Sequence, residues 1–471
     1  MDIIILDNNS QTPLYAQIYE QLKQEIVTGL LPEGSRLPST RHLAQTLAVG
    51  RNTVEYASLQ LSSEGYVTSR VGSGFTVEKL SGFMYLTNKK DSPQMEQSSA
   101  QDKEPSNLYP YHFQYGNLSA QDFPIHMWKK ISSKALASLT AEDMTAYCDK
   151  MGEMGLRHAL SIYLQESRGV FCSAEQIIIC SGFDYALTLL CQLLRNKMTH
   201  IAIEEPGYIG AKNIFIDNGF TLLPVPVEKD GLNMEELERS SADIVYVTPS
   251  HQFPTGAVTS IQKRLLLLEW AKRKNGFIIE DDYDSELRYH SRPIPSISSV
   301  VGNEHVVYIG TFSKALSPSL RMSYMVLPKK LLNLYHNELN MQQTPVSILD
   351  QRIIQELMRS GYWANHLRKT CVVYKKKHDV LIRTISETME GMVKIHGKNA
   401  GLHILLESLQ GLTEKEMIER AKEYGVLVMP VSIFWSDPTN YSDNMVLLGF
   451  GNISEHDIIQ GIKALSLAWK I

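Results

Sequence analysis

The sequence YIGTFSK at residues 308–314, followed seven residues later by Arg321, decides how the rest of this chain is interpreted. The apolar, β-branched run before Gly310 predicts a buried strand. A lysine just past such a strand suits a cofactor that forms a Schiff base, because the amine condenses with an aldehyde. Arg321 and the hydroxyls of Thr311 and Ser313 suit a phosphate on that cofactor. The alternative is a lysine in a surface loop, and the remaining sequence has to decide between the two.

Length and composition indicate an ordinary multidomain globular protein. The chain has 471 residues, more than one compact core normally holds, so two or three domains are expected. Hydrophobic residues make up 43% of the sequence and charged residues 21%, both usual for a globular protein. The formal net charge of −5 gives no overall basic character, so any contact with nucleic acid must come from a local patch.

The cysteines and the amino-terminal segment bear on localisation. The five cysteines form no CxxC pair, and several lie in apolar runs. This pattern favours reduced, buried thiols over a disulfide or zinc framework. The sequence begins without the basic segment of a signal peptide, and no apolar run reaches about 18 residues. We therefore expect a cytoplasmic protein without a membrane segment.

Three short helices are predicted in the first eighty residues. Apolar residues recur at helical spacing over residues 14–26, and Gly29 ends this first helix. Ser39 is predicted to cap a second helix, with Leu43 and Leu47 on its apolar face. The third helix is expected to turn four apolar side chains inward, namely Val54, Ala57, Leu59 and Leu61.

A two-stranded wing is predicted next, because residues 67–77 alternate around a Gly-Ser-Gly turn. Three helices and a wing indicate a winged helix-turn-helix. Its third helix would enter the major groove from its amino-terminal end, which carries Arg51, Asn52 and Thr53. Residues 36–70 contain four arginines against two glutamates, a modest positive patch. A small helical domain that packs on another protein is the alternative.

Four motifs of this segment resemble the GntR-type winged-helix regulators: LPSTRHLA from residue 37, RNTV from 51, EGY from 64 and GSGF from 72. In that family the arginines that match Arg41 and Arg51 lie at the DNA with the wing glycines, which implies contacts to phosphate or guanine. The expected DNA-binding residues are Ser39, Arg41, Arg51, Asn52, Thr53, Arg70 and Gly72. Gly50 departs from the family, where a serine is usual, and this loses either a phosphate contact or a helix cap.

Residues 81–107 are polar and keep no period, which predicts a flexible linker. It would join a winged-helix domain of residues 1–80 to a second domain of residues 108–471. A flexible chain of some twenty-five residues spans about 25–30 Å. Such a linker would let the DNA-binding domain lie over a neighbouring subunit.

From residue 109 onward, apolar strands alternate with amphipathic helices. The predicted strands are 176–180, 200–204, 221–227, 243–248, 276–280, 306–309 and 322–327. Helices such as 185–194 and 262–273 lie between them. The alternation is typical of an α/β domain whose mostly parallel sheet is covered on both faces. Ligands of such sheets bind at the carboxyl ends of the strands.

Polar motifs fall at these strand ends. Ser181 and Gly182 follow one strand and begin a helix, whose N–H groups suit a phosphate. The acids at 280–282 end a buried strand, and one of them can pair with a protonated pyridine nitrogen. A metal site or a helix cap is the alternative for these acids. Tyr283 is placed to donate to the phenolic oxygen of such a ring, and Tyr208 to border it.

These motifs and YCDKMG at 147–152 resemble, in order and spacing, the fold type I aminotransferases that use pyridoxal 5'-phosphate. The resemblance implies that Lys314 is the Schiff-base lysine, Asp281 the partner of the pyridine nitrogen and Arg321 the phosphate clamp. It also implies a dimer, because the tyrosine that matches Tyr147 reaches the phosphate of the partner's cofactor. A smaller α+β part is expected at the carboxyl end. The expected cofactor-binding residues are Lys314, Asp281, Tyr283, Arg321, Ser181, Gly182, Phe183, Tyr208, Ser313, Thr311, Tyr147 and His251.

Two departures concern the ring of the cofactor. Enzymes of this fold have an asparagine that donates to the ring oxygen, and Phe253 takes its place. His251 and Gln252 are the candidates to replace that asparagine. The spacing from acid to tyrosine is two residues rather than the usual three, which leaves Asp282 as an alternative to Asp281.

A third departure concerns the substrate. Enzymes of this fold carry an arginine that forms a bidentate pair with the substrate carboxylate, and Leu447 stands in its place. A ligand with a carboxylate would therefore lack its usual partner, unless another arginine or a residue of a partner chain replaces it. This favours a sensor over a transaminase, and pyridoxal phosphate itself as the signal, as in PdxR-like regulators of its synthesis.

A GntR-type winged helix joined to an aminotransferase-like body is the arrangement of the MocR/GabR regulators. This resemblance covers the whole chain and implies a transcriptional regulator that dimerises head-to-tail. Its binding to double-stranded operator DNA would respond to pyridoxal phosphate or an amino compound at Lys314, with control of pyridoxal phosphate synthesis or amino-compound metabolism. A working aminotransferase with an added DNA-binding domain is one alternative. A regulator whose large domain is only a dimerisation scaffold is the other.

Overall fold

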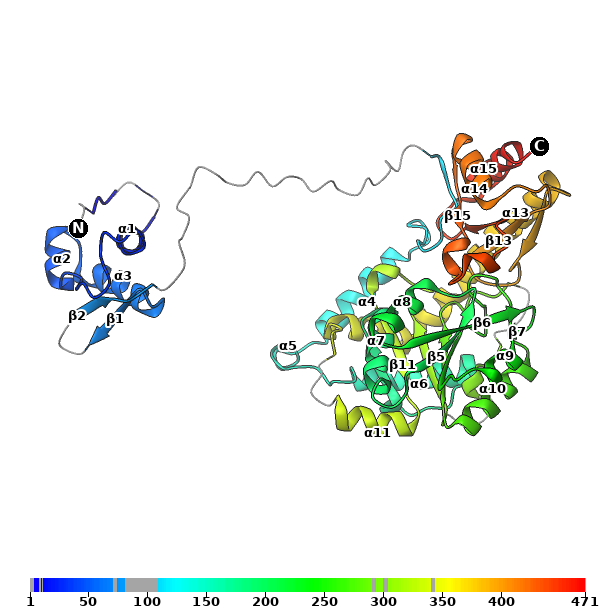
Figure 1. Cartoon of the computed structure of the whole chain (residues 1–471), viewed down its shortest axis with the longest axis horizontal. Helices are drawn as coiled ribbons and strands as arrows, with labels where there is room; N and C mark the ends of the chain where they lie inside the picture. Colours follow the sequence, from blue (N-terminus) through cyan, green and yellow to red (C-terminus); the bar gives the residue numbers. More distant parts are fainter. Residues whose placement is uncertain are drawn as a thin grey trace. The chain divides into compact units, whose positions relative to one another are not determined.

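The structure is a computed structural model that describes residues 4–7, 10, 12–70, 74–80, 109–289, 294–299, 304–339 and 344–470. The chain forms two compact units, Met1–Lys103 and Glu104–Ile471 (Figure 1). The predicted linker, residues 81–107, lies outside the described residues. Within the described ranges, no helix combines the length and the apolar character needed to cross a bilayer.

The first unit is a winged helix. Its elements are α1 (Leu14–Val27), α2 (Thr40–Thr46), α3 (Arg51–Ser63), β1 (Val67–Arg70) and β2 (Gly74–Val77). The two strands pair antiparallel, as predicted for the wing. Ile18 and Leu22 of α1 pack against Val54 and Leu61 of α3, and all four are fully buried. The unit therefore has a hydrophobic core of its own.

The starts of α2 and α3 differ in how they are capped. The hydroxyl of Ser39 accepts a first-turn N–H of α2 at 3.1 Å, as predicted. Gly50 precedes α3 and supplies no side-chain cap. The prediction for Leu59 was wrong, because this side chain is 54% exposed. The inward face of α3 runs through Val54 and Leu61, and Leu59 lies outside that stripe.

The second unit is organised around an eight-stranded sheet. In spatial order its strands are β4 (Ile177–Cys180), β11 (Ser323–Val326), β10 (Val306–Thr311), β9 (Phe277–Asp282), β8 (Ile244–Val247), β5 (His200–Glu205), β6 (Thr221–Glu228) and β7 (Gly231–Leu232). The five strands from β10 to β6 are parallel. β11 runs antiparallel between β10 and β4. Each of the seven predicted strands overlaps one strand of this sheet.

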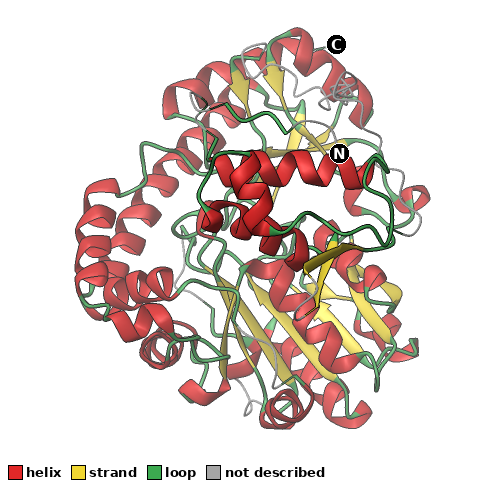
Figure 2. Cartoon of the chain, turned by 90° about the vertical axis from the view of Figure 1, so that its left-hand side faces the viewer, coloured by secondary structure: helices red, strands yellow, loops and turns green. Residues whose placement is uncertain are grey.

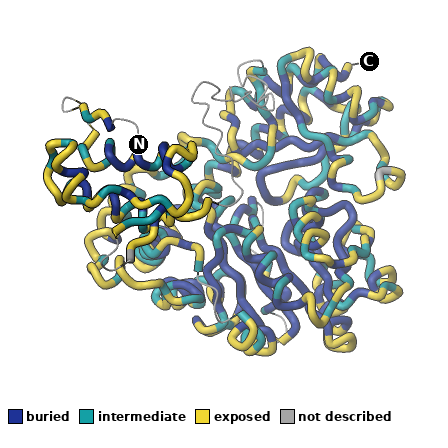
Figure 3. The backbone as a smooth tube through the Cα atoms, turned by 60° about the vertical axis from the view of Figure 1, so that its left-hand side comes forward, coloured by how far each residue is buried: buried dark blue, intermediate teal, exposed yellow. Residues whose placement is uncertain are grey.

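Helices cover both faces of the sheet. Alternate strand residues point to opposite faces, and because both sets are apolar, each face is buried under helices. On one face Ile178 packs with α7 (Gly182–Leu194), α8 (Ile209–Asp217) and α11 (Lys329–Glu338). On the other, Ile177 and Ile179 pack with α4 (Ile125–Ala137), α6 (Met154–Arg168) and α12 (Ile348–Arg359). The same face is continued by α9 (Met234–Arg239) and α10 (Ile261–Lys274). Figure 2 shows the strands between these helices, and Figure 3 shows how completely they are buried.

A smaller α+β part completes the unit, as predicted. Its antiparallel sheet has the order β12 (Val393–His396), β13 (His403–Ser408), β16 (Met445–Gly449) and β15 (Met429–Pro430). The helices α13 (Tyr362–Thr388), α14 (Glu414–Glu423) and α15 (Glu455–Ala468) pack on it. β14 (Val426–Leu427) pairs in parallel with β3 (Tyr111–His112). This pairing ties the start of the second unit to its carboxyl-terminal part.

Candidate functional site

A cavity of about 440 Å³ opens at the carboxyl ends of β8, β9 and β10. Its far wall comes from the carboxyl-terminal part and contains Met429, Ile433 and Phe434. Eight residues predicted from the sequence line the cavity: Phe183, Tyr208, Asp281, Tyr283, Thr311, Ser313, Lys314 and Arg321. Parallel strands end at one edge of the sheet, so motifs far apart in the chain meet here.

Lys314 follows β10 and projects into the cavity. Its Nζ lies 4.0 Å from the centroid of the Tyr115 ring and 3.5 Å from the carbonyl oxygen of Gly116. Burial lowers the pKa of Lys314 to about 8, although the carboxylate of Asp284 opposes this shift. The neutral amine is the nucleophilic form of lysine, so the cavity makes Lys314 more reactive than a surface lysine. The alternative of a surface loop is thereby excluded.

A cluster of donors for an anion lies beside Lys314. Gly182, the first residue of α7, has a φ of +82°, and a Cβ there would lie 2.8 Å from Nη2 of Arg321. The glycine therefore leaves the space that the guanidinium occupies. Arg321 is held by an ion pair with Asp184 at 3.0 Å. The hydroxyls of Thr311 and Ser313 lie 3.0 Å apart. Together with the first N–H groups of α7 they suit a phosphate.

The acids at the end of β9 face opposite sides of the sheet. Asp281 lines the cavity, and the hydroxyl of Tyr246 donates to it at 2.5 Å. Burial raises the pKa of Asp281 to about 8. A cation such as a protonated pyridine nitrogen would stabilise its charged form. Among the described residues, no group of three or more His, Cys, Asp or Glu side chains could hold a metal ion.

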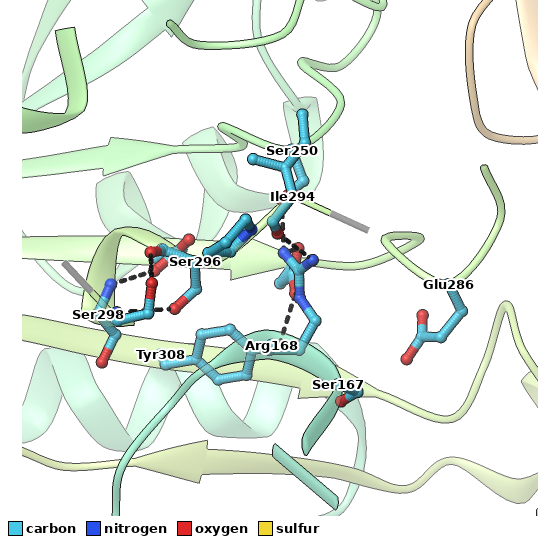
Figure 4. Close-up of polar contacts among 12 residues, drawn as sticks. Ser167, Arg168, Ser250, Glu286, Ile294, Ser296, Ser298 and Tyr308 are labelled. Carbon is cyan, nitrogen blue, oxygen red and sulfur yellow. Dashed lines mark hydrogen bonds and ion pairs between the residues drawn. The ribbon is translucent and has the colours of Figure 1, made fainter. Parts of the chain in front are cut away.

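Asp282 is already paired on the other side of β9. Arg168, the last residue of α6, donates to both carboxylate oxygens of Asp282, at 2.7 and 3.0 Å. The hydroxyl of Tyr308 donates to Asp282 at 2.5 Å. Arg168 also donates to Ser250 at 2.8 Å, and Figure 4 shows Arg168 between Ser250 and Tyr308. Burial opposes ionisation, but Arg168 and these hydrogen bonds hold the pKa of Asp282 below its ordinary value. Asp282 therefore has a structural partner, and Asp281 remains for the cavity.

The structure does not bring His251 or Gln252 to the cavity. His251 is buried, and its Nδ1 lies 2.7 Å from Asp284. Gln252 donates to the carbonyl oxygens of Pro206 and Phe253 at 2.8 and 2.6 Å. His251 contacts the site through the hydroxyl of Tyr283, which donates to its carbonyl oxygen at 2.9 Å. Phe253, at the position where the resemblance implies an asparagine in the enzymes, lines the cavity.

Other predicted residues lie outside the cavity. Ser181 precedes α7, directly before the Gly182 turn. Tyr147 is 89% exposed and apart from this chain's cavity. In the first unit, Arg41, Arg51 and Asn52 are exposed, as is Ser39, and Thr53 is half-buried. The side chain of Arg70 and all of Gly72 lie outside the described residues.

Sequence reasoning missed several residues of the site. Tyr115 and Gly116 lie against Lys314, although they are almost 200 positions earlier in the chain. Met429, Ile433 and Phe434 form the wall opposite. Apolar residues near a strand are normally assigned to the core, so nothing in their spacing indicated a binding surface. Arg168 was missed because nothing near it in the sequence indicates a partner at β9.

Leu447 on β16 is fully buried. It packs in a cluster with Phe253, Leu405 and Phe434. The place where the enzymes carry a substrate-binding arginine is therefore part of an apolar core. Among the described residues, the cluster around Leu447 consists of apolar and aromatic side chains.

Two family patterns match the chain. The pattern described as "Bacterial regulatory proteins, gntR family" matches residues 14–77, and "Aminotransferase class I and II" matches residues 114–440. A protein of Rhizobium meliloti named "Probable rhizopine catabolism regulatory protein MocR" is 32% identical over 99% of this chain and 96% of its own length. The chain belongs to the MocR-type transcriptional regulators.

Other relatives of this MocR-type regulator carry similar names. The "Uncharacterized HTH-type transcriptional regulator YdeL" of Bacillus subtilis is 38% identical, and the match covers 100% of both chains. The "HTH-type pyridoxine biosynthesis transcriptional regulator PdxR" of Corynebacterium glutamicum is 26% identical over 96% of this chain and 95% of its own length. The protein is therefore a DNA-binding regulator rather than an enzyme.

Solved structures place the second unit of this MocR-type regulator in the aminotransferase fold. The structure of Pyrococcus horikoshii kynurenine aminotransferase, solved with PMP, superposes with a TM-score of 0.68 at 26% identity, covering 76% of this chain and 90% of that one. The cofactor of the MocR-type regulator is pyridoxal 5'-phosphate. Its own residues fit this group, because Gly182 leaves room beside Arg321 and the buried Asp281 has no cationic partner of its own among the groups that shift its pKa.

Proposed function

We propose that this protein binds operator DNA as a head-to-tail homodimer in the cytoplasm. In this proposal, occupancy of the Lys314 site by pyridoxal phosphate, alone or with an amino compound, sets its operator affinity. Residues 1–80 bind the DNA, residues 81–107 act as a flexible linker, and residues 108–471 bind the cofactor and dimerise. The regulated genes serve pyridoxal phosphate synthesis or amino-compound metabolism, in keeping with what the names of the PdxR and MocR relatives describe.

One contrast carries this proposal. Eight of the groups proposed to bind pyridoxal phosphate line one cavity, whereas the buried Leu447 stands in the place of the substrate-binding arginine. A domain that served only for dimerisation would not need a buried, reactive Lys314. A transaminase would need a partner for the substrate carboxylate. A site that binds the cofactor but has no partner for a substrate carboxylate suits a sensor.

The roles of the chain's own residues follow from their positions. Pyridoxal phosphate supplies an aldehyde that takes up amines and a ring that withdraws electrons. Lys314 offers its amine to that aldehyde, and Asp281 holds the proton of the pyridine nitrogen. Arg321, Thr311 and Ser313 bind the phosphate, with Ser181 and Gly182 at the start of α7. The remaining proposed contacts are the rings of Phe183, Tyr208 and Tyr283, His251 acting through Tyr283, and Tyr147 acting on the partner's site.

The proposed DNA contacts lie at the starts of α2 and α3 and in the wing. They are Ser39, Arg41, Arg51, Asn52, Thr53, Arg70 and Gly72. The exposure of Arg41, Arg51 and Asn52 supports this assignment, because a side chain must be accessible to reach a groove. A dimer would present two such surfaces to two half-sites.

Coupling between the sites requires two arrangements of the dimer. A ligand at Lys314 changes DNA affinity only if it binds these arrangements with different affinity. A coupling of about 1–3 kcal/mol changes operator affinity about 5–150-fold, and DNA then changes ligand affinity by the same factor.

The test is titration of an operator duplex, selected in vitro from random sequence, at fixed salt with and without pyridoxal phosphate. The full-length protein should respond, and Lys314→Ala should lose most of the response. Residues 1–80, which have their own core, should bind weakly and without response. If the full-length protein has the same operator affinity with and without pyridoxal phosphate and with every amine tested, the scaffold alternative is correct.

A further inference from the structure

The cavity has two chemically different sides. The side at the sheet carries Lys314, Arg321, the hydroxyls and Asp281. A second, apolar side consists of Ile209, Phe253, Met429, Ile433 and Phe434, and the rings of Phe253 and Phe434 pack with their centroids 4.9 Å apart. None of these five apolar residues is assigned to the cofactor, so the second side is left for whatever binds beside it.

The apolar side is held in place by buried polar contacts. Lys212 donates to the carbonyl oxygen of Phe434 at 2.7 Å, to Ser436 at 2.9 Å and to Glu205 at 2.7 Å. On the other flank, the carboxylate of Glu414 accepts the N–H of Ser432 at 2.9 Å and its hydroxyl at 2.5 Å. The segment that carries Ile433 and Phe434 is therefore fixed at both ends. The apolar surface is preformed.

The charges around the cavity disfavour a carboxylate on this side. Among the described lining residues, Lys314 and Arg321 are the only lysines and arginines, and both are assigned to the cofactor. Asp281 lines the cavity, and the carboxylate of Asp284 acts on Lys314. Leu447 lies buried behind the wall. A carboxylate bound here would lose its water without gaining a cation from this chain.

We propose that the amino compound sensed at the Lys314 site is a primary amine with an apolar body and no carboxylate. This inference rests on the proposed function, since a primary amine would take the place of the Lys314 nitrogen on the cofactor's aldehyde carbon and release Lys314 as a free amine. The apolar body packs against Phe253, Ile433 and Phe434. An α-amino acid with the same side chain is excluded by its carboxylate.

The first test compares two ligands that differ only in the carboxylate. Full-length protein loaded with pyridoxal phosphate is dialysed to equilibrium against 2-phenylethylamine or against L-phenylalanine. The amine should bind at least about 100-fold more tightly, because an unpaired carboxylate costs far more than it contributes in an apolar site. Equal binding of the two ligands, or tighter binding of L-phenylalanine, would overturn the inference.

A second test supplies the missing cation. Ile433 lines the cavity and is 44% exposed, so Ile433→Arg can keep its charge hydrated in the free protein. This variant should bind L-phenylalanine at least about tenfold more tightly than the unchanged chain does. Ile216→Arg is the control, because Ile216 is 57% exposed on α8 and does not line the cavity. A gain in the control as large as that in Ile433→Arg would contradict the role of the wall.

The loading step separates this inference from the proposed function. Loading is followed by the absorbance near the boundary of the visible and ultraviolet, and by its loss on treatment with borohydride. A protein that gains no such band disproves the proposed function, and the inference with it. A protein that loads normally and then binds both ligands equally disproves the inference alone.

Discussion

Lys314 loses its proton more readily than an exposed lysine, and this has a measurable consequence. Its pKa of about 8 lies below the ordinary value of 10.5 because the side chain is buried. Between these two pH values the unfolded chain binds more protons than the folded one, so this group makes the cofactor-free protein more stable as the pH rises through the window. The neutral amine is also the form that reacts.

We therefore predict that the rate at which cofactor-free protein takes up pyridoxal phosphate rises with pH and levels off near pH 8. It should change about tenfold per pH unit below that value, as expected for one titrating group. Stopped-flow absorbance in amine-free buffers measures this rate. A rate that keeps rising to pH 10 would show that burial does not set the reactivity of Lys314.

The two neighbouring acids of β9 provide a matched pair of variants. Asp281→Asn should weaken pyridoxal phosphate binding at least about tenfold, because the ring nitrogen loses its charged partner. It should leave the urea midpoint of the cofactor-free protein unchanged or raise it. Asp282→Asn should instead cost about 3–5 kcal/mol of stability, because Arg168 would be left buried and unpaired. Absorbance titration and urea unfolding distinguish the two, and the opposite pattern would assign the ring to Asp282.

For individual residues, the sequence predicted which side chains come together at the cavity, but it did not predict how these side chains are oriented. The spacing of the acids left Asp281 and Asp282 as alternatives. The choice depends on Arg168, whose position 114 residues before Asp282 gives no local signal. His251 was expected at the cavity, and its carboxylate partner Asp284 holds it behind Tyr283 instead.

At the scale of elements, α2 and α3 carry the predicted DNA contacts. If Arg41 or Arg51 binds phosphate, neutralising it to glutamine should reduce the slope of the log–log salt dependence of operator binding by about one unit. A contact to a base should instead cost about 1–3 kcal/mol at one operator position. Arg383→Gln, an exposed arginine of α13, controls for the change in net charge. Unchanged operator binding in both variants would show that α3 does not enter the groove.

The elements themselves were largely predictable, because their patterns are local. Buried β-branched runs gave the seven strands, and helical spacing gave α1 and α2. Leu59 was misplaced because leucine is normally buried, whereas the stripe through Val54 and Leu61 already fills the core. The wall segment with Ile433 and Phe434 could not be predicted, since it depends on contacts to Lys212 and to Glu414, which lie elsewhere in the chain.

At the scale of the whole molecule, the exposed Tyr147 gives a test of the proposed dimer. Tyr147→Phe should weaken pyridoxal phosphate binding about tenfold if its hydroxyl donates to a phosphate. A mixed dimer combines one Tyr147→Phe subunit with one Lys314→Ala subunit. Its one remaining Lys314 lies in the Tyr147→Phe subunit, and the Tyr147 that would reach this site comes from the other subunit and is intact. Absorbance titration should then show native affinity at half the stoichiometry. Weak affinity in the mixed dimer would mean that Tyr147 acts within its own chain.

The separate cores of the two units have a consequence for how the protein melts. A chain with two cores need not unfold in one step, so a scanning calorimeter should record two heat-absorption peaks. Pyridoxal phosphate stabilises only the unit that binds it, by about 4 kcal/mol at a free concentration a thousandfold above its dissociation constant. The peak of Glu104–Ile471 should therefore move to higher temperature while that of Met1–Lys103 stays in place. Operator DNA should raise the melting temperature of Met1–Lys103. If one ligand alone shifts both peaks, the two units are still coupled at the temperature at which they melt.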